Sequence, residues 1–166
     1  IATESVPNRL KKQEIKVNGS ATPKQEETEN RDGMDIAICT IDTQNKVIEY
    51  AGAQNPLLLL QNNEMQVIKA DRFSIGGAPI STERTFTKQV IPIETDSTFY
   101  IYSDGYQDQF GGPKSKKITK RRLKNQFLSH QDLDLNAQKV ELLQFYETWQ
   151  GSENQIDDVC IIGVKV

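Results

Sequence analysis

Residues 99–105 read Phe-Tyr-Ile-Tyr-Ser-Asp-Gly, an aromatic and β-branched run that ends in an aspartate followed by glycine. Such a run is typical of a strand, and Asp-Gly is typical of the turn after one. Residues 155–162, Gln-Ile-Asp-Asp-Val-Cys-Ile-Ile, place two acids directly before the last apolar run of the chain. Carboxylates at the ends of neighbouring strands can bind one divalent cation, or they can simply form a turn and a solvated strand entrance. The residues alone leave both interpretations open.

Short β-rich runs surround the first of these stretches, and turn formers such as Asn, Asp and Pro separate them. Their close spacing favours antiparallel pairing, because a parallel crossover needs a dozen or more residues. We predict strands at 36–41, 46–51, 57–60, 65–69, 85–93 and 98–102. The final run, 159–164, is almost continuously apolar, which predicts a central strand buried on both faces.

Two segments after Pro113 have helical periodicity. Apolar residues recur at three-to-four spacing within 116–128 and within 136–150, and Gly151 is suited to end the second helix. Strands followed by two helices and a late strand predict an α+β fold, a layered β-sandwich flanked by helices.

The composition excludes several classes of protein. With 20 Lys and Arg against 23 Asp and Glu among 166 residues, the net charge of −3 does not favour nucleic acids or membranes as global partners. The longest apolar run, 57–60, is far too short to span a bilayer, so we expect no membrane contact from this segment. Cys39 and Cys160 lie far apart with no Cys-x-x-Cys pair, which indicates a reduced, cytoplasmic setting rather than a zinc ribbon or a disulfide scaffold.

The chain contains a single histidine, His130, in a polar stretch that predicts a solvated loop. One imidazole is too few for most catalytic zinc sites. Any metal chemistry must therefore use oxygen ligands, which points to Mg²⁺ or Mn²⁺.

Residues 1–31 differ in character from the rest. Leu10, Ile15 and Val17 among charged residues suggest the remnant of a helix, and residues 18–31 form a polar connector with one apolar residue. Because the chain starts at Ile1 rather than at a methionine, we expect it to be a piece of a longer protein, with 32–166 as part of a folded domain.

Five segments of residues 32–166, taken in order, resemble the SpoIIE-type serine phosphatases of the metal-dependent, 2C-like (PPM) class. They are Asp-Gly-Met-Asp at 32–35, Tyr-Ala-Gly-Ala-Gln-Asn-Pro at 50–56, Ser-Ile-Gly-Gly at 74–77, the run from Ser-Asp-Gly to Gly-Gly at 103–112, and Gln-Ile-Asp-Asp at 155–158. The resemblance implies a β-sandwich flanked by helices. It also implies two Mn²⁺ or Mg²⁺ ions and a bridging water that attacks phosphoserine or phosphothreonine.

By the same resemblance, Asp104 and Asp157 are metal ligands, with Asp158 as the alternative within its pair, and Gly105 and Asp108 lie near the site. The implied substrate is a phosphorylated bacterial regulatory protein, such as an anti-sigma-factor antagonist, in a signal transduction pathway. The implied location is the cytoplasm, for example as a domain of a larger sensor protein.

The family also carries an Asp-Gly-His-Gly segment with further ligands, whereas this chain has no Gly-His or His-Gly pair. We therefore expect the N-terminal metal-binding segment to be missing, with weak metal binding and little turnover by these residues alone. The alternative is a truncated or degenerate phosphatase-like module that binds its partner without turnover.

Seven basic residues fall within positions 114–124, with no acidic residue among them. This pattern is typical of a solvated helix face. It also suits steering of a phosphorylated or acidic partner by Lys116, Lys117, Lys120 and Arg121, or nucleic-acid binding. No aromatics interleave with the bases as on a single-strand platform, so nucleic acid is the least favoured reading. The sequence leaves the oligomeric state open.

Overall fold

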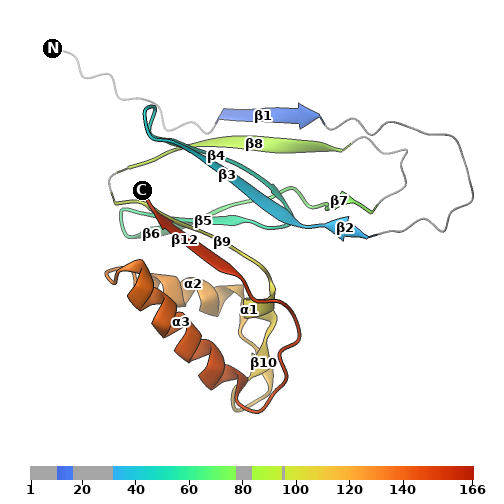
Figure 1. Ribbon diagram of the computed structural model, residues 1–166, viewed down its shortest axis with the longest axis vertical. Helices are drawn as coiled ribbons and strands as arrows, with labels where there is room; N and C mark the ends of the chain where they lie inside the picture. The colour runs from blue at the N-terminus through green and yellow to red at the C-terminus, as the bar shows by residue number, and fades with distance from the viewer. Residues whose placement is uncertain (1–10, 17–31, 78–83, 95) are drawn as a thin grey trace, which may run out of the picture. The chain divides into compact units, whose positions relative to one another are not determined.

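The computed structural model describes residues 11–16, 32–77, 84–94 and 96–166 (Figure 1). The chain divides into two compact units, one made of residues 1–54 and 69–94 and the other of residues 55–68 and 95–166. Each unit contains one four-stranded antiparallel sheet. The predicted α+β class with antiparallel pairing is therefore confirmed.

The first unit contains a sheet with the strand order β1-β8-β4-β3. Its strands are β1 (Lys11–Lys16), β8 (Thr85–Pro92), β4 (Val47–Ala53) and β3 (Ile36–Asp42), and a short second pair joins β2 (Gly33–Met34) to β7 (Ile75–Gly76). Alternate residues of the inner strand β4 are buried, with Ile48 and Tyr50 fully so, as a period of two requires. Asp42 closes the β3–β4 turn by accepting the backbone N–H groups of Gln44 and Asn45.

The helix remnant predicted around residues 10–17 is wrong where the structure describes it. Residues 11–16 form β1, which pairs antiparallel with β8 from Lys11 opposite Val90 to Lys16 opposite Thr85. Pairing with β8 supplies backbone hydrogen bonds to this run. The helix propensity of a short run with few apolar residues is too weak to compete with them. The predictions for residues 1–10 and 17–31 lie outside the described residues.

The second unit contains a sheet with the strand order β12-β9-β5-β6 and helices on one of its faces (Figure 1). Its elements are β5 (Leu57–Gln61), β6 (Glu64–Ile68), β9 (Thr98–Tyr102), α1 (Gly105–Asp108), β10 (Phe110–Gly111), β11 (Lys116–Lys117), α2 (Thr119–Ser129), α3 (Leu135–Gln150) and β12 (Ile161–Lys165). The predicted longer strands and the second helix are confirmed with ends within two residues. The first helix begins at Thr119, because the preceding lysines of β11 pair with β10.

The helices pack on this sheet through an aromatic core. The rings of Tyr100 on β9 and Phe127 on α2 stack with centroids 4.0 Å apart, and Tyr106 and Tyr146 lie 5.2 Å apart. The phenol groups are satisfied inside the core, since the Tyr100 hydroxyl donates to Oε1 of Gln138 at 2.8 Å. Burial raises the pKa of both Tyr100 and Tyr106, so these phenols stay protonated and act as structural donors. This core fixes where β9 ends.

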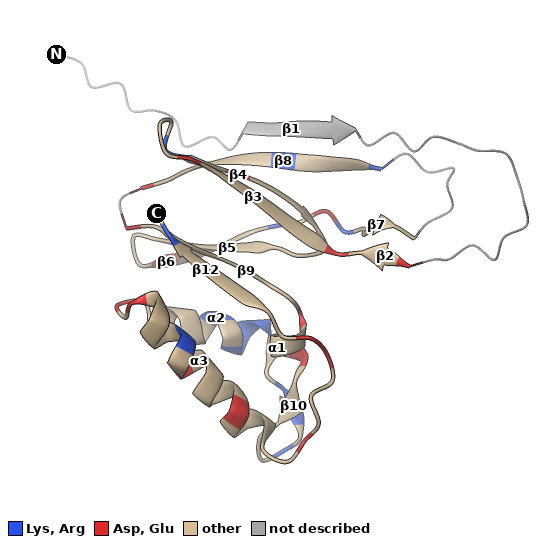
Figure 2. Cartoon of the chain, viewed as in Figure 1, with Lys and Arg blue, Asp and Glu red and all other residues tan. Residues whose placement is uncertain are grey.

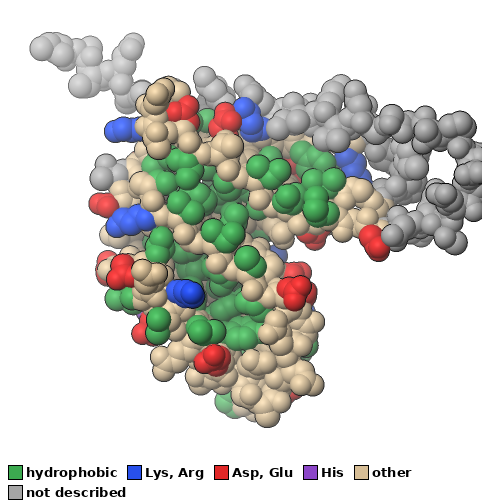
Figure 3. All heavy atoms as spheres, viewed as in Figure 1, with side chains coloured by type: hydrophobic (Ala, Val, Ile, Leu, Met, Phe, Trp, Pro, Cys, Tyr) green, Lys and Arg blue, Asp and Glu red, His purple; other side chains and the backbone are tan. Residues whose placement is uncertain are grey.

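The prediction that 159–164 is a central strand buried on both faces is wrong. β12 is an edge strand that pairs with β9, and Ile162 remains 49% exposed. Leu143 on α3 is 51% exposed as well. Green apolar side chains cover much of the face that Figure 3 shows. A continuous apolar run is compatible with a central strand and with a strand whose second face is uncovered, so the pattern could not separate them.

Trp149 at the end of α3 fastens the β10–β11 hairpin. Its indole Nε1 donates to the carbonyl of Lys116 at 3.0 Å, and its own carbonyl accepts the N–H of Gly112 at 2.7 Å. A side chain at Gly111 would place Cβ 1.8 Å from the Trp149 carbonyl oxygen, and Gly112 has a φ of +66°. The Arg122 guanidinium lies 4.6 Å from the centre of the indole ring. The two glycines thus allow the hairpin to contact the helix directly.

Trp149→Ala should lower the free energy of unfolding by about 3 kcal/mol, because it removes a large ring and the hydrogen bond that anchors the hairpin. Val140→Ala on the exposed face of the same helix is the control and should cost less than about 0.5 kcal/mol. Urea denaturation of both variants measures the difference. A loss below about 1 kcal/mol for Trp149→Ala would show that the ring does not hold the hairpin.

Candidate functional site

Asp104 lies where β9 gives way to α1, in the position of the helix N-cap. Its side chain makes no capping hydrogen bond and is exposed, while its carbonyl accepts the N–H of Asp108 at 3.0 Å. An aspartate at this position would ordinarily bind the free N–H groups of the first turn. The carboxylate of Asp104 is instead available for another ligand.

Asp157 and Asp158 lie in the exposed loop that leads from α3 into β12. The Asp157 side chain accepts the N–H of Asp158 at 2.7 Å, and the Asp157 carbonyl accepts Nε2 of Gln155 at 2.8 Å. These local bonds fix the backbone of the pair and leave carboxylate oxygens unused.

Ser103 joins the two aspartate loops. Its hydroxyl donates to the carbonyl of Asp158 at 2.8 Å and accepts the N–H of Cys160 at 2.9 Å, and its backbone N–H donates to the carbonyl of Cys160 at 2.9 Å. Gly105 permits the close approach, since a Cβ there would lie 2.4 Å from the Asp158 carbonyl oxygen. The two segments predicted to meet at neighbouring strand ends therefore do lie side by side.

Gln109, which the sequence analysis did not identify, supports this arrangement from below. Its fully buried side chain accepts the hydroxyl of Tyr146 at 2.9 Å and donates to the carbonyls of Asn154 and Phe110 at 2.9 and 3.0 Å. The Gln109 side chain thereby connects α3, the loop that carries Asp157 and Asp158, and the hairpin. Only its position between the aromatic residues Tyr106 and Phe110 could have indicated burial.

Comparison with known proteins identifies the family. A family model described as Stage II sporulation protein E (SpoIIE) matches residues 21–166, most of the chain. The chain belongs to the SpoIIE family. The predicted resemblance is thereby confirmed, and the family is one of serine/threonine phosphatases.

Solved structures agree with the SpoIIE assignment. The SiaA-PP2C domain of Pseudomonas aeruginosa is similar with a TM-score of 0.71 and 26% identity over 80% of this chain and 51% of that chain. The phosphatase domain of the cell fate determinant SpoIIE from Bacillus subtilis has the same fold, with a TM-score of 0.54 and 12% identity over 79% of this chain and 57% of that chain. The chain thus spans about half the length of these domains. No curated protein matches the sequence.

The SpoIIE-type site needs hard oxygen ligands. Asp104, Asp157 and Asp158 supply ligands of this type but too few of them. All three offer carboxylate oxygens of the type that Mg²⁺ and Mn²⁺ prefer. Within residues 11–16, 32–77, 84–94 and 96–166, however, no three His, Cys, Asp or Glu side chains are grouped to hold a metal. The loops bring Gly105, the neighbour of Asp104, against the backbone of Asp157 and Asp158, and a complete two-metal site needs further ligands.

The remaining predicted site residues fall into two groups. Asp108 is engaged by Lys117, with 3.0 Å between Oδ2 and Nζ, so neither side chain is freely available. Lys116, Lys120 and Arg121 are exposed on the hairpin and α2, as Figure 2 shows for the basic start of α2 beside α1. The ion pair thus links the end of α1 to the basic segment.

His130 is not the fully solvated loop residue that was predicted. It ends α2, with its side chain 23% exposed and Nε2 3.9 Å from a carboxylate oxygen of Glu141 on α3. It takes no part in the aspartate site. No helix of the described residues is long and apolar enough to cross a membrane.

Proposed function

We propose that this chain is part of a metal-dependent phosphatase domain that hydrolyses phosphoserine or phosphothreonine on a regulatory protein. The observation that carries the proposal is the Ser103 hydroxyl, which fastens the Asp104 loop to the Asp157–Asp158 loop in a member of the SpoIIE family. The Ser103 hydroxyl holds the backbones of the two acidic loops together. It suits a site where two carboxylates must be held together.

In this proposal Asp104 and Asp157 hold Mn²⁺ or Mg²⁺, with Asp158 as the alternative. A bound divalent cation supplies charge stabilisation at the phosphoryl oxygens and lowers the pKa of a coordinated water. The protein groups provide placement. Gly105 lets the two loops touch, Ser103 sets their spacing, and Gln109 holds the loop backbone from inside the core.

The natural partner in this proposal is a phosphorylated bacterial regulatory protein, such as an anti-sigma-factor antagonist, in signal transduction. The setting is the cytoplasm, where unpaired thiols persist. Both cysteines are free, and burial raises the pKa of Cys39 to about 11, which keeps its thiol protonated.

Phosphate release from a phosphoserine peptide tests the proposal in the full-length protein. We expect release in the presence of Mn²⁺ and none after its removal by EDTA, restored when Mn²⁺ is added back. Release that persists unchanged in EDTA would contradict a metal-dependent site.

A second candidate is a phosphatase-like binding module without turnover. It is favoured by the absence, among the described residues, of three grouped ligand side chains. It predicts that the full-length protein binds the phosphopeptide in the same assay and releases no phosphate with any metal.

A further inference from the structure

The basic segment of the second unit is segregated from the acidic remainder of the chain. Seven of the 20 Lys and Arg residues lie within positions 114–124, so the other 13 are outnumbered by the 23 Asp and Glu residues, all of which lie elsewhere. Such segregation creates a local positive field on a protein whose net charge is negative.

Five of these residues are exposed, and the four of them other than Lys117, which pairs with Asp108, form what we call the basic platform: Lys114, Lys116, Lys120 and Arg121. No ion pair to any of the four is found in the part of the chain that the structure describes. By contrast, Lys117 is paired with Asp108, and Arg122 covers the Trp149 ring and approaches the carbonyl of Ile118 at 3.3 Å. The platform is thus the part of the segment that remains available to a partner.

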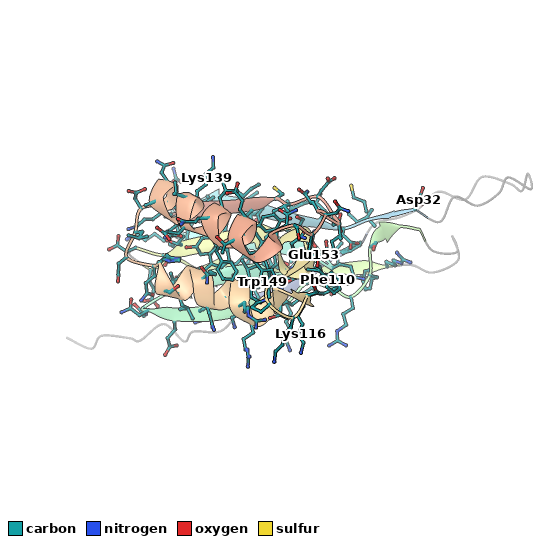
Figure 4. The ribbon with its side chains drawn as sticks, turned by 90° about the horizontal axis from the view of Figure 1, so that it is seen from below. Asp32, Phe110, Lys116, Lys139, Trp149 and Glu153 are labelled. Atoms are coloured by element: carbon teal, nitrogen blue, oxygen red, sulfur yellow. The ribbon has the colours of Figure 1, made fainter. Side chains whose placement is uncertain are left out.

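The platform rests on a rigid support. Trp149 binds the hairpin from one side through the carbonyl of Lys116, and Ser115 donates to Glu153 at 2.7 Å from the loop after α3 (Figure 4). The N–H of Ile118 donates to the carbonyl of Gln109 at 3.1 Å. This bond joins the start of α2 to the buried glutamine that holds the carbonyl of Asn154. Lysines on a fixed hairpin lose less conformational freedom on binding than lysines on a loose loop.

The platform begins close to Asp104. One turn of α1, about 6 Å, separates Asp104 from Asp108. Oδ2 of Asp108 in turn lies 3.0 Å from Nζ of Lys117 in the hairpin. An extended peptide covers about 3.3 Å per residue. A peptide with its phosphoserine at Asp104 would therefore bring residues about three to five positions away over the platform.

The nearby aromatic residues favour a protein over a nucleic acid. Trp149 is covered by Arg122 and contacts Gly112, and Phe110, which is 39% exposed, has Lys117 Nζ 5.7 Å from its ring centre. Single-stranded nucleic acid binds best where aromatic faces are open for base stacking. The remaining acidic excess of the chain also opposes an extended phosphate backbone more than a short acidic peptide.

We propose that the basic platform recognises the substrate protein by acidic residues about three to five positions from its phosphorylated serine. The phosphoserine part of this inference rests on the proposed function, whereas recognition of the acidic residues does not. The interaction is electrostatic, so it weakens as ionic strength rises.

The test is fluorescence anisotropy with the full-length protein and labelled phosphoserine peptides, with Asp and Glu placed three to five positions from the phosphoserine or replaced by Asn and Gln. We expect the acidic peptide to bind roughly tenfold more tightly at low salt, with this preference lost near 0.5 M salt. The triple charge reversal K116E/K120E/R121E should abolish the preference. Lys139→Glu, exposed on α3 and away from Lys116 in Figure 4, is the matched control and should retain it.

Equal binding of both peptides to the wild type, or an unchanged preference in the triple variant, would overturn the inference. So would a DNA oligonucleotide that binds the platform more tightly than the acidic peptide. If the reversed variant does not fold by circular dichroism, the triple glutamine variant replaces it. Acidic-peptide binding without phosphate release would refute the proposed function and leave this inference standing.

Discussion

Asp104→Asn should reduce Mn²⁺-dependent phosphate release by the full-length protein by roughly 100- to 1,000-fold. The substitution keeps the shape of the side chain and removes its charge, and charge stabilisation by a bound cation contributes several kcal/mol to such reactions. The carboxylate is exposed and makes no capping hydrogen bond, so the fold should persist. The rate constants kcat and kcat/KM with an aryl phosphate measure the effect.

Asp132→Asn is the matched control for that experiment, since Asp132 is also exposed in the second unit and lies in the turn after α2. It should retain full activity. Both variants should change the free energy of unfolding by less than about 0.5 kcal/mol, as a typical surface substitution does. Retained activity in Asp104→Asn would remove this residue from the metal site.

Ser103→Ala should weaken Mn²⁺ binding by roughly 10- to 100-fold, the range found when a group that orients metal ligands is lost. The alanine leaves the Asp158 carbonyl and the Cys160 N–H without their shared partner, so the two aspartate loops can separate. The same loss should lower the free energy of unfolding by about 1–2 kcal/mol. Calorimetric titration with Mn²⁺ and urea denaturation measure the two effects.

Ser103→Thr separates positioning from mere stability, because threonine keeps the hydroxyl and suits the end of a strand. It should restore most of the Mn²⁺ affinity. Ser129→Ala removes a hydroxyl that bonds only within the end of α2 and should leave the affinity at the wild-type value. If Ser103→Ala destabilises the protein without changing Mn²⁺ affinity, Ser103 has a structural role only.

Local sequence pattern was sufficient to predict most of the longer elements. The run 98–102 and the helix ending at Gly151 were predicted because alternation, periodicity and a glycine cap are encoded by near neighbours. Two predictions failed where a distant partner decides the structure. Residues 11–16 become a strand through pairing with β8, and β12 lies at a sheet edge, which its own apolar pattern cannot reveal.

The candidate site was predictable in part, because the local pattern also shows where an acidic residue adjoins a strand. Asp104 and the Asp157–Asp158 pair stand directly beside strand residues, and β9 and β12 are neighbours, so their acidic ends meet. The roles of Ser103 and Gln109 depend on contacts across 37 or more residues of sequence, which no local pattern contains. Arg122 and Lys117 are likewise engaged within the protein only because the tertiary fold brings them to Trp149 and Asp108. The local pattern could not separate them from the exposed basic residues.

The central claim is that Asp104 and the Asp157–Asp158 pair form one cation site, and calorimetric titration of residues 1–166 with Mn²⁺ tests it most directly. We predict one weak site that is lost in Asp104→Asn and in the double variant D157N/D158N. Its Kd should be on the order of 10⁻⁴ to 10⁻³ M, the weak end of the range for cation sites built from oxygen ligands. Unchanged binding in these variants would contradict the claim. Tight binding of two ions by the wild type would contradict the expectation that ligands are missing.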